Sequence, residues 1–334
     1  MTSNNQPTLG LVLGDRNGIG PEIAAKLLAE GAGDTARAVV IGDPHVLARG
    51  CEIAGVTLQT TTIAGPGEIR SEISSADGIT ILPHGTSSDQ FTPGEVSGAA
   101  GTECLDNLAF AAKLAATGVL DGMVFAPLNK ASLHAGGMQH EDETRYLQDV
   151  LGYGGAVGEL NVSNGLWTSR VTSHVPLKDV SGYINEATIV EAVELLHKAV
   201  QASGVTSPRL GLCALNPHAG DGGNFGREEI EVLEPAIKVI QSRGMDVTGP
   251  WPSDTVFVRA QKGEFDGVVT MYHDQGQIAM KLMGFSTGVT VAGGLPIPVT
   301  TCAHGTAFDI AGQGIAGTGS IAAAWDLCAR MAIA

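Results

Sequence analysis

The chain has 334 residues, of which 43% are hydrophobic and only 4% aromatic, and it contains 46 glycines. A chain of this length is longer than the domains that usually form around a single hydrophobic core, so we expect two domains. The composition is that of a compact α/β enzyme rather than of a disordered chain. The formal net charge of −16 argues against nucleic acid or an anionic membrane as partner.

Cysteine usage and the N-terminal residues indicate the compartment. The five cysteines are scattered and form no CxxC pair, which favours reduced buried thiols over a disulfide framework. The first residues, Met-Thr-Ser-Asn-Asn-Gln-Pro, lack the basic and apolar regions of a secretory signal. No apolar run reaches the roughly eighteen residues that a membrane span requires. We therefore expect a cytoplasmic protein.

Strand-like and helix-like stretches alternate along the chain. Residues 9–13, 39–41 and 122–126 have the pattern of buried strands. Helical spacing of apolar residues occurs in 21–30, where Pro21 occupies a first-turn position, and in 105–114, 189–200 and 230–240. This alternation predicts a mainly parallel sheet with crossover helices. We also expect the chain to cross between its two domains more than once.

Three histidines each close an apolar, strand-like run. His174 ends the run from Leu166, His218 ends the run from Leu210, and His273 ends the run from Val268. The carboxyl ends of the strands form the ligand crevice of a parallel α/β sheet, and three imidazoles leave a catalytic metal one open coordination position. We therefore predict a metal site, although each histidine alone is also compatible with a hydrogen-bonded structural role. The remaining histidines that lack this setting are His45, His84, His134, His140 and His197.

Two glycine-rich segments each separate a strand-like from a helical stretch. Residues 14–22, GDRNGIGPE, have neither the GxGxxG order of a dinucleotide fingerprint nor the GK[ST] ending of a phosphate loop. They form either a tight turn or a site wall where backbone approaches a ligand. Residues 218–229 form either a mobile surface loop or a segment whose following helix N-terminus attracts an anion.

A further loop, 304–314, combines small residues with one aspartate before the last helical stretch. Such a loop can enclose an adenine, and Asp309 can accept a hydrogen bond from a ribose hydroxyl. This is a candidate nucleotide-binding loop.

Several segments distributed over the chain carry a common pattern. They are GDRNGIGPE at 14–22, TSHVPL at 172–177, LNPHAGDGGNFGREE at 215–229, SDTVF at 253–257, YHDQG at 272–276, Lys281, and HGTAFDIAG at 304–312. With these segments the chain resembles the 4-hydroxythreonine-4-phosphate dehydrogenase family, PdxA, over nearly its whole length. The last segment also looks like the nucleotide loop of isocitrate and isopropylmalate dehydrogenases.

The resemblance implies an isocitrate/isopropylmalate dehydrogenase-like fold, with two α/β domains and a cleft between them. The nucleotide-binding domain is expected at 1–133 plus 282–334, and the metal, substrate and dimerisation domain at 134–281. The implied assembly is a homodimer with active sites shared between the subunits. His174, His218 and His273 would bind one divalent metal, for which zinc is expected first and magnesium, manganese or cobalt are the alternatives.

The resemblance also implies roles for further residues. NAD or NADP would be held by the nucleotide loop, whose implied cofactor-binding positions are His304, Gly305, Thr306, Ala307, Asp309 and Gly312. Asp254 would be the catalytic base that accepts the alcohol proton, and Lys281 would bind an anionic group or the developing oxyanion. Both are also substrate-binding positions of the family, together with Thr144.

Three further positions depart from the family pattern. A family histidine is Glu143 here, a family asparagine is Thr290, and a family arginine is Val299. Glu143 and Thr290 remain implied substrate-binding positions. Losing an arginine and a histidine weakens a clamp on phosphate or carboxylate. We therefore expect a carboxylated cis-dihydrodiol of the terephthalate type as substrate, and the stretch 159–162 with Leu166-Trp167 resembles such paralogues.

The expected reaction is oxidation of a secondary alcohol beside a carboxylated carbon, followed by decarboxylation, with the metal as Lewis acid. The alternatives are 4-hydroxythreonine-4-phosphate dehydrogenase of pyridoxal phosphate biosynthesis and a phosphorylated sugar-acid dehydrogenase. Two other classes remain open: an acyl or phosphoryl transferase of the same fold, and a non-catalytic module with a structural metal. The partner expected in every enzyme case is a small-molecule substrate.

Overall fold

A computed structural model of the chain describes residues 6–72, 78–85 and 91–334. They form two compact units, one of Met1–Gly155 with Leu295–Ile333 and one of Ala156–Gly294. The domain boundaries expected from the sequence lie earlier in the chain, after residues 133 and 281. Residues 134–155 belong to the first unit, where the Tyr146 hydroxyl donates to the Leu105 carbonyl at 3.0 Å.

Within the described residues of the first unit, six parallel strands lie in the order β3-β4-β2-β1-β5-β12. Their bounds are β1 (Thr8–Val12), β2 (Arg37–Gly42), β3 (Thr60–Thr62), β4 (Ile79–Pro83), β5 (Gly122–Phe125) and β12 (Val299–Cys302). Leu9, Leu11 and Val12 are almost completely buried, because a parallel sheet is covered on both faces and its strands are apolar throughout.

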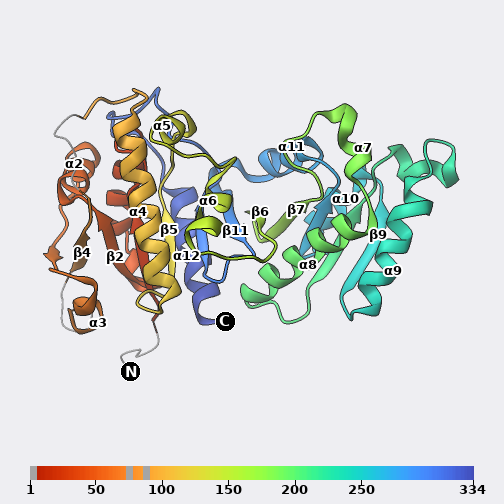
Figure 1. Cartoon of the computed structure of the whole chain (residues 1–334), viewed down its shortest axis with the longest axis horizontal. Coiled ribbons are helices and arrows are strands. Elements are labelled where there is room, and N and C mark those ends of the chain that lie inside the picture. The colour runs from red at the N-terminus through yellow and green to blue at the C-terminus, as the bar shows by residue number, and fades with distance from the viewer. Residues whose placement is uncertain (1–5, 73–77, 86–90) are drawn as a thin grey trace. The chain divides into compact units, whose positions relative to one another are not determined.

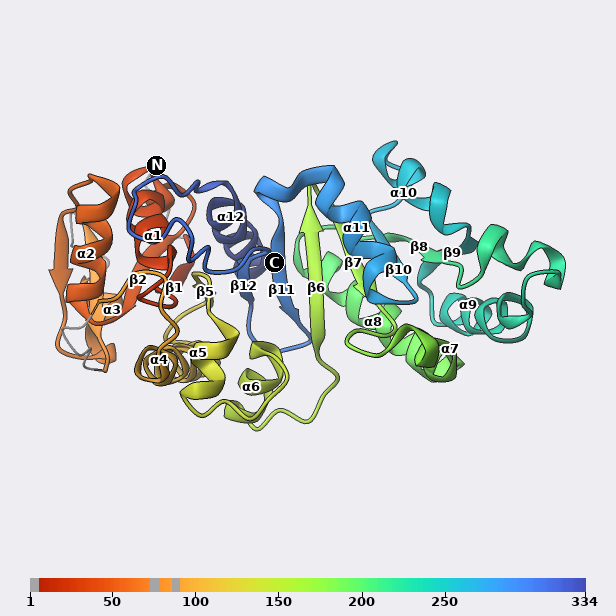
Figure 2. The ribbon, with the colours of Figure 1, turned by 90° about the horizontal axis from the view of Figure 1, so that it is seen from above.

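The described part of the first unit includes seven α-helices. They are α1 (Gly20–Ala29), α2 (Pro44–Ala54), α3 (Ile69–Glu72), α4 (Gly98–Ala116), α5 (Lys130–Ala135), α6 (Glu143–Val150) and α12 (Gly319–Ile333). Figure 2 shows α1 and α12 on one face of this unit's strands and α4 with α5 on the other. Side-chain caps begin several of these helices: Asp43 accepts from the His45 amide and Ser97 from the Ala100 amide.

The second unit contains six strands in the order β11-β6-β7-β10-β8-β9. Their bounds are β6 (Gly158–Ser163), β7 (Leu166–Arg170), β8 (Arg209–Cys213), β9 (Asp246–Trp251), β10 (Gly267–Thr270) and β11 (Val289–Gly293). Strands β7, β10, β8 and β9 are parallel, whereas β6 is antiparallel to both of its neighbours. The parallel strands therefore present their carboxyl ends at one edge.

Five helices cover the strands of the second unit. They are α7 (Val180–Tyr183), α8 (Glu186–Ala202), α9 (Glu234–Ser242), α10 (Ser253–Gln261) and α11 (His273–Gly284). Within this unit, α8 and α9 lie on one face of the strands and α10 and α11 on the other (Figures 1 and 2). Val256, Phe257 and Met280 of the last two helices pack with Leu166 and Val268 of the strands in one buried cluster.

The structure confirms the predicted α/β class and the predicted elements. Residues 9–13, 39–41 and 122–126 correspond to β1, β2 and β5, and 21–30, 105–114 and 189–200 lie in α1, α4 and α8, apart from the C-cap Glu30. The stretch 230–240 is divided, because a π-helical turn (Glu229–Leu233) precedes α9. Pro235 lies in the first turn of α9. It has no backbone N–H, so it cannot donate the hydrogen bond that a continuous α-helix would have at this position.

The buried thiols agree with the sequence-based expectation. All five cysteines are free, four are buried, and only Cys51 is partly exposed. Burial raises the pKa of the Cys213 and Cys328 thiols to about 12, which makes them poor nucleophiles. In the described part of the chain, no helix is long and apolar enough to cross a membrane.

Candidate active site

The predicted histidines follow the carboxyl ends of three adjacent parallel strands of the second unit. His174 comes four residues after β7, His218 five residues after β8, and His273 three residues after β10, as the first residue of α11. Strand β10 pairs in parallel with both β7 and β8. Sheet geometry therefore delivers all three segments to one edge, as the apolar runs in the sequence predict.

His174 and His273 are brought together within one chain. Their ring centroids are 5.9 Å apart with an interplanar angle of 44°. The Nδ1 atom of His273 lies 2.7 Å from Oδ1 of Asp274. A carboxylate at Nδ1 favours the proton on that nitrogen and leaves the Nε2 lone pair for a metal. The two imidazole rings therefore lie close together, and one of them contacts a carboxylate.

His218 has different surroundings in the same chain. It begins a run of six residues with positive φ, from φ 54° at His218 to φ 98° at Gly223, and its ring packs against Phe225 at 6.2 Å. Among the residues that the structure describes, no group of three histidine, cysteine or acidic side chains could hold a metal ion. One chain thus assembles two of the three predicted ligands.

The left-handed run at His218 is anchored by a buried carboxylate. Glu229 is 1% exposed, and its Oε1 accepts from the amides of Leu215 and Asn216 at 2.9 and 2.7 Å. Its other oxygen accepts from the Asn216 side chain at 2.9 Å. These amides are occupied by the protein's own carboxylate. This segment therefore orients His218 and does not present those amides to an external anion.

Asp254 and Lys281, the residues with implied catalytic roles, are exposed residues of α10 and α11. Gln275 links the start of α10 by hydrogen bonds to the carboxyl ends of the strands that precede the histidines. Its Nε2 donates to the Ser253 hydroxyl and to the Ala214 carbonyl, both at 2.8 Å, and its Oε1 accepts from the Met271 amide. Asp254 follows Ser253 directly, so its backbone is held beside the strand ends that precede His218 and His273.

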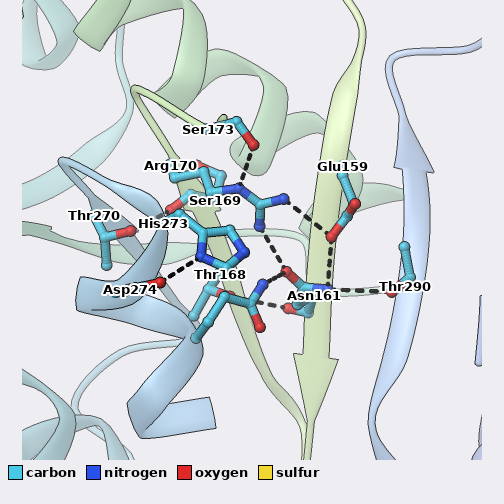
Figure 3. A network of polar contacts seen from close by, with 11 residues as sticks. Glu159, Asn161, Thr168, Ser169, Arg170, Ser173, Thr270, His273, Asp274 and Thr290 are labelled. Carbon is cyan, nitrogen blue, oxygen red and sulfur yellow. Dashed lines mark hydrogen bonds and ion pairs between the residues drawn. The ribbon is translucent and has the colours of Figure 1, made fainter. Parts of the chain in front are cut away.

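Thr290, an implied substrate-binding residue, belongs to a polar network on β6, β7, β11 and α11 (Figure 3). Its hydroxyl accepts from Asn161 Nδ2 at 3.2 Å. Asn161 in turn accepts from Arg170 at 2.9 Å, and Arg170 pairs with Glu159 at 3.0 Å. The roles of Asn161 and Arg170 were not predicted from the sequence. The only feature of the sequence that could have indicated such a role is the charge of Arg170 at the end of the apolar run from Leu166.

The implied cofactor loop lies in the first unit, between β12 and α12. Ala307 has φ 42° and Gly312 φ 79°, so the loop includes left-handed positions that small residues tolerate. Thr306 is buried, whereas Asp309 is exposed. His304 Nδ1 lies 3.0 Å from the Gly305 carbonyl. The exposed carboxylate of Asp309 is accessible to a ligand hydroxyl.

The turn at 14–22 packs against this loop. The Ile19 amide donates to the Thr306 carbonyl at 3.1 Å. A Cβ atom on Gly18 would lie 2.8 Å from Thr306 Cβ, so only glycine permits the contact. The turn is therefore tight, as predicted, and it is also a wall that supports the loop.

Asp15 is completely buried in this turn. Its Oδ1 accepts from the Asn17 amide at 2.9 Å, while its Oδ2 has no hydrogen-bond partner in the described part of the chain. Burial raises the pKa of Asp15 above its usual value, and the hydrogen bond from Asn17 opposes this only in part. The beginning of the turn therefore contains a fully buried carboxyl group with a raised pKa.

The remaining implied substrate positions also lie in the first unit. Glu143 is the first residue of α6, and Thr144, the next residue, is buried. Val299 begins β12 and is fully buried. The aliphatic side chain at 299 is therefore packed as part of the core.

The fold and the strand-end histidines together define a mixed α/β protein with a paired-imidazole site. Residues 34–328 match the family model described as "Pyridoxal phosphate biosynthetic protein PdxA". The chain belongs to this PdxA family.

Two curated relatives are similar over nearly the full length. A Pseudomonas aeruginosa protein named "Putative 4-hydroxythreonine-4-phosphate dehydrogenase 2" is 46% identical, with 99% of this chain and 98% of the relative covered. A Cupriavidus necator protein named "D-threonate 4-phosphate dehydrogenase" is 39% identical, with 94% of each covered.

Solved structures resemble the chain as well. A 4-hydroxythreonine-4-phosphate dehydrogenase from Klebsiella pneumoniae has a TM-score of 0.85 at 33% identity, with 99% of both chains covered. A terephthalate 1,2-cis-dihydrodiol dehydrogenase from Burkholderia xenovorans has a TM-score of 0.67 at 29% identity, with 95% of this chain and 96% of that chain covered. The phosphate-named proteins are thus the more similar ones.

Proposed function

We propose that the chain is an NAD(P)-dependent, divalent-metal-dependent dehydrogenase acting on a small 4-phosphorylated hydroxy acid. It would oxidise the secondary alcohol beside the carboxylated carbon and release carbon dioxide from the product. The observation that carries the proposal is the pairing of His174 with His273 in a chain of this family.

The phosphorylated substrate replaces the dihydrodiol as the first expectation. Relatives named for 4-phosphate substrates are 46% and 39% identical, compared with 29% for the dihydrodiol dehydrogenase structure. The sequence-based preference relied on two replaced positions, Glu143 and Val299. A phosphate can be held by other cations of the chain, and Lys281 on the exposed end of α11 is the first candidate.

The residues present fit two of the three imidazole positions of a catalytic zinc site. His174 and His273 would bind the metal from one chain, and Asp274 would orient His273 through its Nδ1. We assign the third position to His218 of a second copy of the chain. Helix α11 gives that copy an apolar surface, since Ile278 and Leu282 are 60% and 84% exposed one turn apart.

In the proposed reaction, the chain's own groups bind substrate and move a proton. A bound metal would supply Lewis acidity toward the alcohol oxygen. The Asp254 carboxylate would accept the alcohol proton, and bound NAD(P) would supply the hydride acceptor that oxidation to a β-keto acid requires. The Lys281 ammonium binds an anionic group of the substrate. Carbon dioxide then leaves, and a proton replaces it on carbon.

The cofactor would be bound by the loop from His304 to Gly312, with Asp309 accepting a hydrogen bond from a ribose hydroxyl. The turn at 14–22 would hold this loop in place through Gly18 and Ile19. Zinc is the metal we expect first, with magnesium, manganese and cobalt as alternatives.

The test is a substrate panel followed by NAD(P)H absorbance with the metal-loaded protein. The panel contains 4-hydroxythreonine 4-phosphate, D-threonate 4-phosphate and the cis-dihydrodiol of terephthalate, each with NAD and with NADP. We expect the highest kcat/KM with one of the two phosphates and trapped carbon dioxide in equal amount to NAD(P)H. Higher efficiency on the dihydrodiol would reverse the substrate assignment. Absence of NAD(P) binding by calorimetry would reject the dehydrogenase and leave a transferase of this fold.

A further inference from the structure

Arg170 is a buried cation held by three different acceptors. It ends β7, and its side chain is 6% exposed. Its Nε donates to the Ser173 hydroxyl at 3.0 Å, its Nη1 to Asn161 Oδ1 at 2.9 Å, and its Nη2 pairs with Glu159 Oε1 at 3.0 Å. Figure 3 shows the guanidinium directed toward β6 with these partners around it. A cation so enclosed has a fixed orientation.

Asn161 is the centre of the same network. Its Oδ1 accepts from both Arg170 and Gln277, and its Nδ2 donates to Thr290 at 3.2 Å and to Glu159 at 3.3 Å. The four hydrogen bonds use the full capacity of an amide side chain. The side chain itself is 6% exposed. Asn161 therefore joins four elements: β6, β7, β11 and α11.

Three of the linked elements carry a residue of the candidate site or lead directly into one: β7, β11 and α11. Ser173 immediately precedes His174 in the chain. Gln277 lies four residues after His273 on α11, so both project from the same face of the helix. Thr290 is itself an implied substrate-binding residue. The network therefore contacts Ser173, which adjoins His174, and Gln277, which lies one turn from His273. It contacts Thr290 directly.

A buried ion pair is weak evidence for added stability, because replacing such a pair by apolar side chains of similar volume is often neutral or stabilising. The fully satisfied network does hold its side chains in one geometry. Glu159 also balances the charge of Arg170, so the guanidinium is not an unpaired cation that awaits an anionic ligand.

We propose that Arg170 and Asn161 are positioning residues that set the separation of His174 and His273 and the placement of Thr290. This inference rests on the proposed function for its catalytic consequence, but its structural part is independent of substrate. The pair acts through Ser173 and Gln277 and does not touch substrate. Groups hydrogen-bonded directly to metal ligands typically change metal affinity or activity by about 10–100-fold, and Arg170 and Asn161 lie one contact further from the histidines.

The test uses the full-length protein with four variants that break the network at different points. Arg170→Met and Asn161→Leu remove its centre, while Ser173→Ala and Gln277→Leu each remove one link and leave the strands untouched. Arg209→Met is the matched control, because it removes an arginine–carboxylate pair (Arg209 with Asp266, 2.9 Å) at the amino ends of β8 and β10.

Three measurements are made on each variant: the cobalt(II) dissociation constant with its visible absorption spectrum, kcat and KM on the best substrate, and the His174–His273 ring separation in a crystal structure. For Arg170→Met and Asn161→Leu we expect at least tenfold weaker cobalt binding, an altered spectrum, lower kcat and a ring separation different from 5.9 Å. The single-link variants should show smaller changes in the same direction. Arg209→Met should retain the wild-type spectrum and kcat.

Native ring separation in Asn161→Leu, together with wild-type cobalt affinity in the single-link variants, would overturn the inference and leave the network a purely structural role. The proposed function fails separately, if the wild-type protein oxidises none of the three substrates. In that case the ring separation still decides the positioning role, because it requires neither substrate nor metal.

Discussion

His273 Nδ1 lies 2.7 Å from the carboxylate of Asp274, the next residue of α11. The two side chains are 38% and 74% exposed, so the contact lies at the surface of the unit beside His174. A carboxylate in this position favours the tautomer with the proton on Nδ1 and holds the orientation of the ring.

Replacing Asp274 should therefore weaken metal binding without unfolding the protein. We expect Asp274→Asn to lower zinc affinity by about tenfold and Asp274→Ala by up to about a hundredfold. Competition with a chromophoric zinc chelator measures both. Glu231→Ala is a suitable control, because it also removes an exposed carboxylate of the second unit. If both Asp274 variants bind zinc as tightly as the Glu231→Ala control, Asp274 has no role in metal binding.

The proposed sharing of a metal site between two copies of the chain predicts a specific complementation pattern. His174→Ala, His218→Ala and His273→Ala should each lose bound metal and activity, while the midpoint of thermal unfolding stays near that of the wild type. Co-expression of His218→Ala with His273→Ala chains should restore activity, because one of the two sites in the heterodimer then has all three histidines. The matched pair, His174→Ala with His273→Ala, should remain inactive. Activity in the matched pair, or none in the first, contradicts the assignment of His218 to the second copy.

Asp309 should contribute to cofactor binding more than to turnover. Its carboxylate is exposed on the loop between β12 and α12, and a contact to a ribose hydroxyl is the same before and during hydride transfer. Asp309→Ala should raise the KM for the cofactor by roughly tenfold, at about 1.4 kcal/mol, and leave kcat within a few-fold. Steady-state kinetics at saturating substrate measure both. A large fall in kcat with unchanged KM would assign Asp309 another role.

Asp15 makes stability depend on pH with a defined sign. Burial raises the pKa of Asp15 in the folded state, so its contribution to stability is complete below the unfolded pKa near 3.8 and decreases as pH rises through the folded pKa. A tenfold change in proton affinity is worth about 1.4 kcal/mol. Asp15→Asn should therefore raise the unfolding midpoint by a few degrees near pH 7, and by less near pH 4.

Asp266→Asn is the control of opposite sign. The hydrogen bond from Arg209 holds the pKa of Asp266 below its usual value, so the stability that this carboxylate provides is present above the unfolded pKa and decreases as pH falls through the folded one. Its replacement should be destabilising near pH 7, with the difference shrinking toward low pH. Parallel pH profiles for the two variants would show that Asp15 is not the buried acid described here.

Two replaced positions, Glu143 and Val299, do not by themselves decide which substrate the protein prefers. Val299 and Glu143 replace groups that would bind an anion, so the sequence favours an unphosphorylated substrate. The relatives with higher identity are nevertheless named for 4-phosphate substrates. Two replaced positions describe only the cations that were lost. They do not describe cations elsewhere in the chain, such as Lys281 on α11.

The sequence alone determined the alternating α/β class, the strands at 9–13, 39–41 and 122–126, and the placement of His174 and His273 at the carboxyl ends of parallel strands. These features depend on local periodicity and on the rule that parallel strands end at one edge. Only the tertiary structure decided that Asn161 contacts Gln277, 116 residues away, and Thr290, 129 residues away. Such contacts depend on strand order and register, and the residues concerned carry no local pattern that distinguishes them from ordinary surface polar side chains.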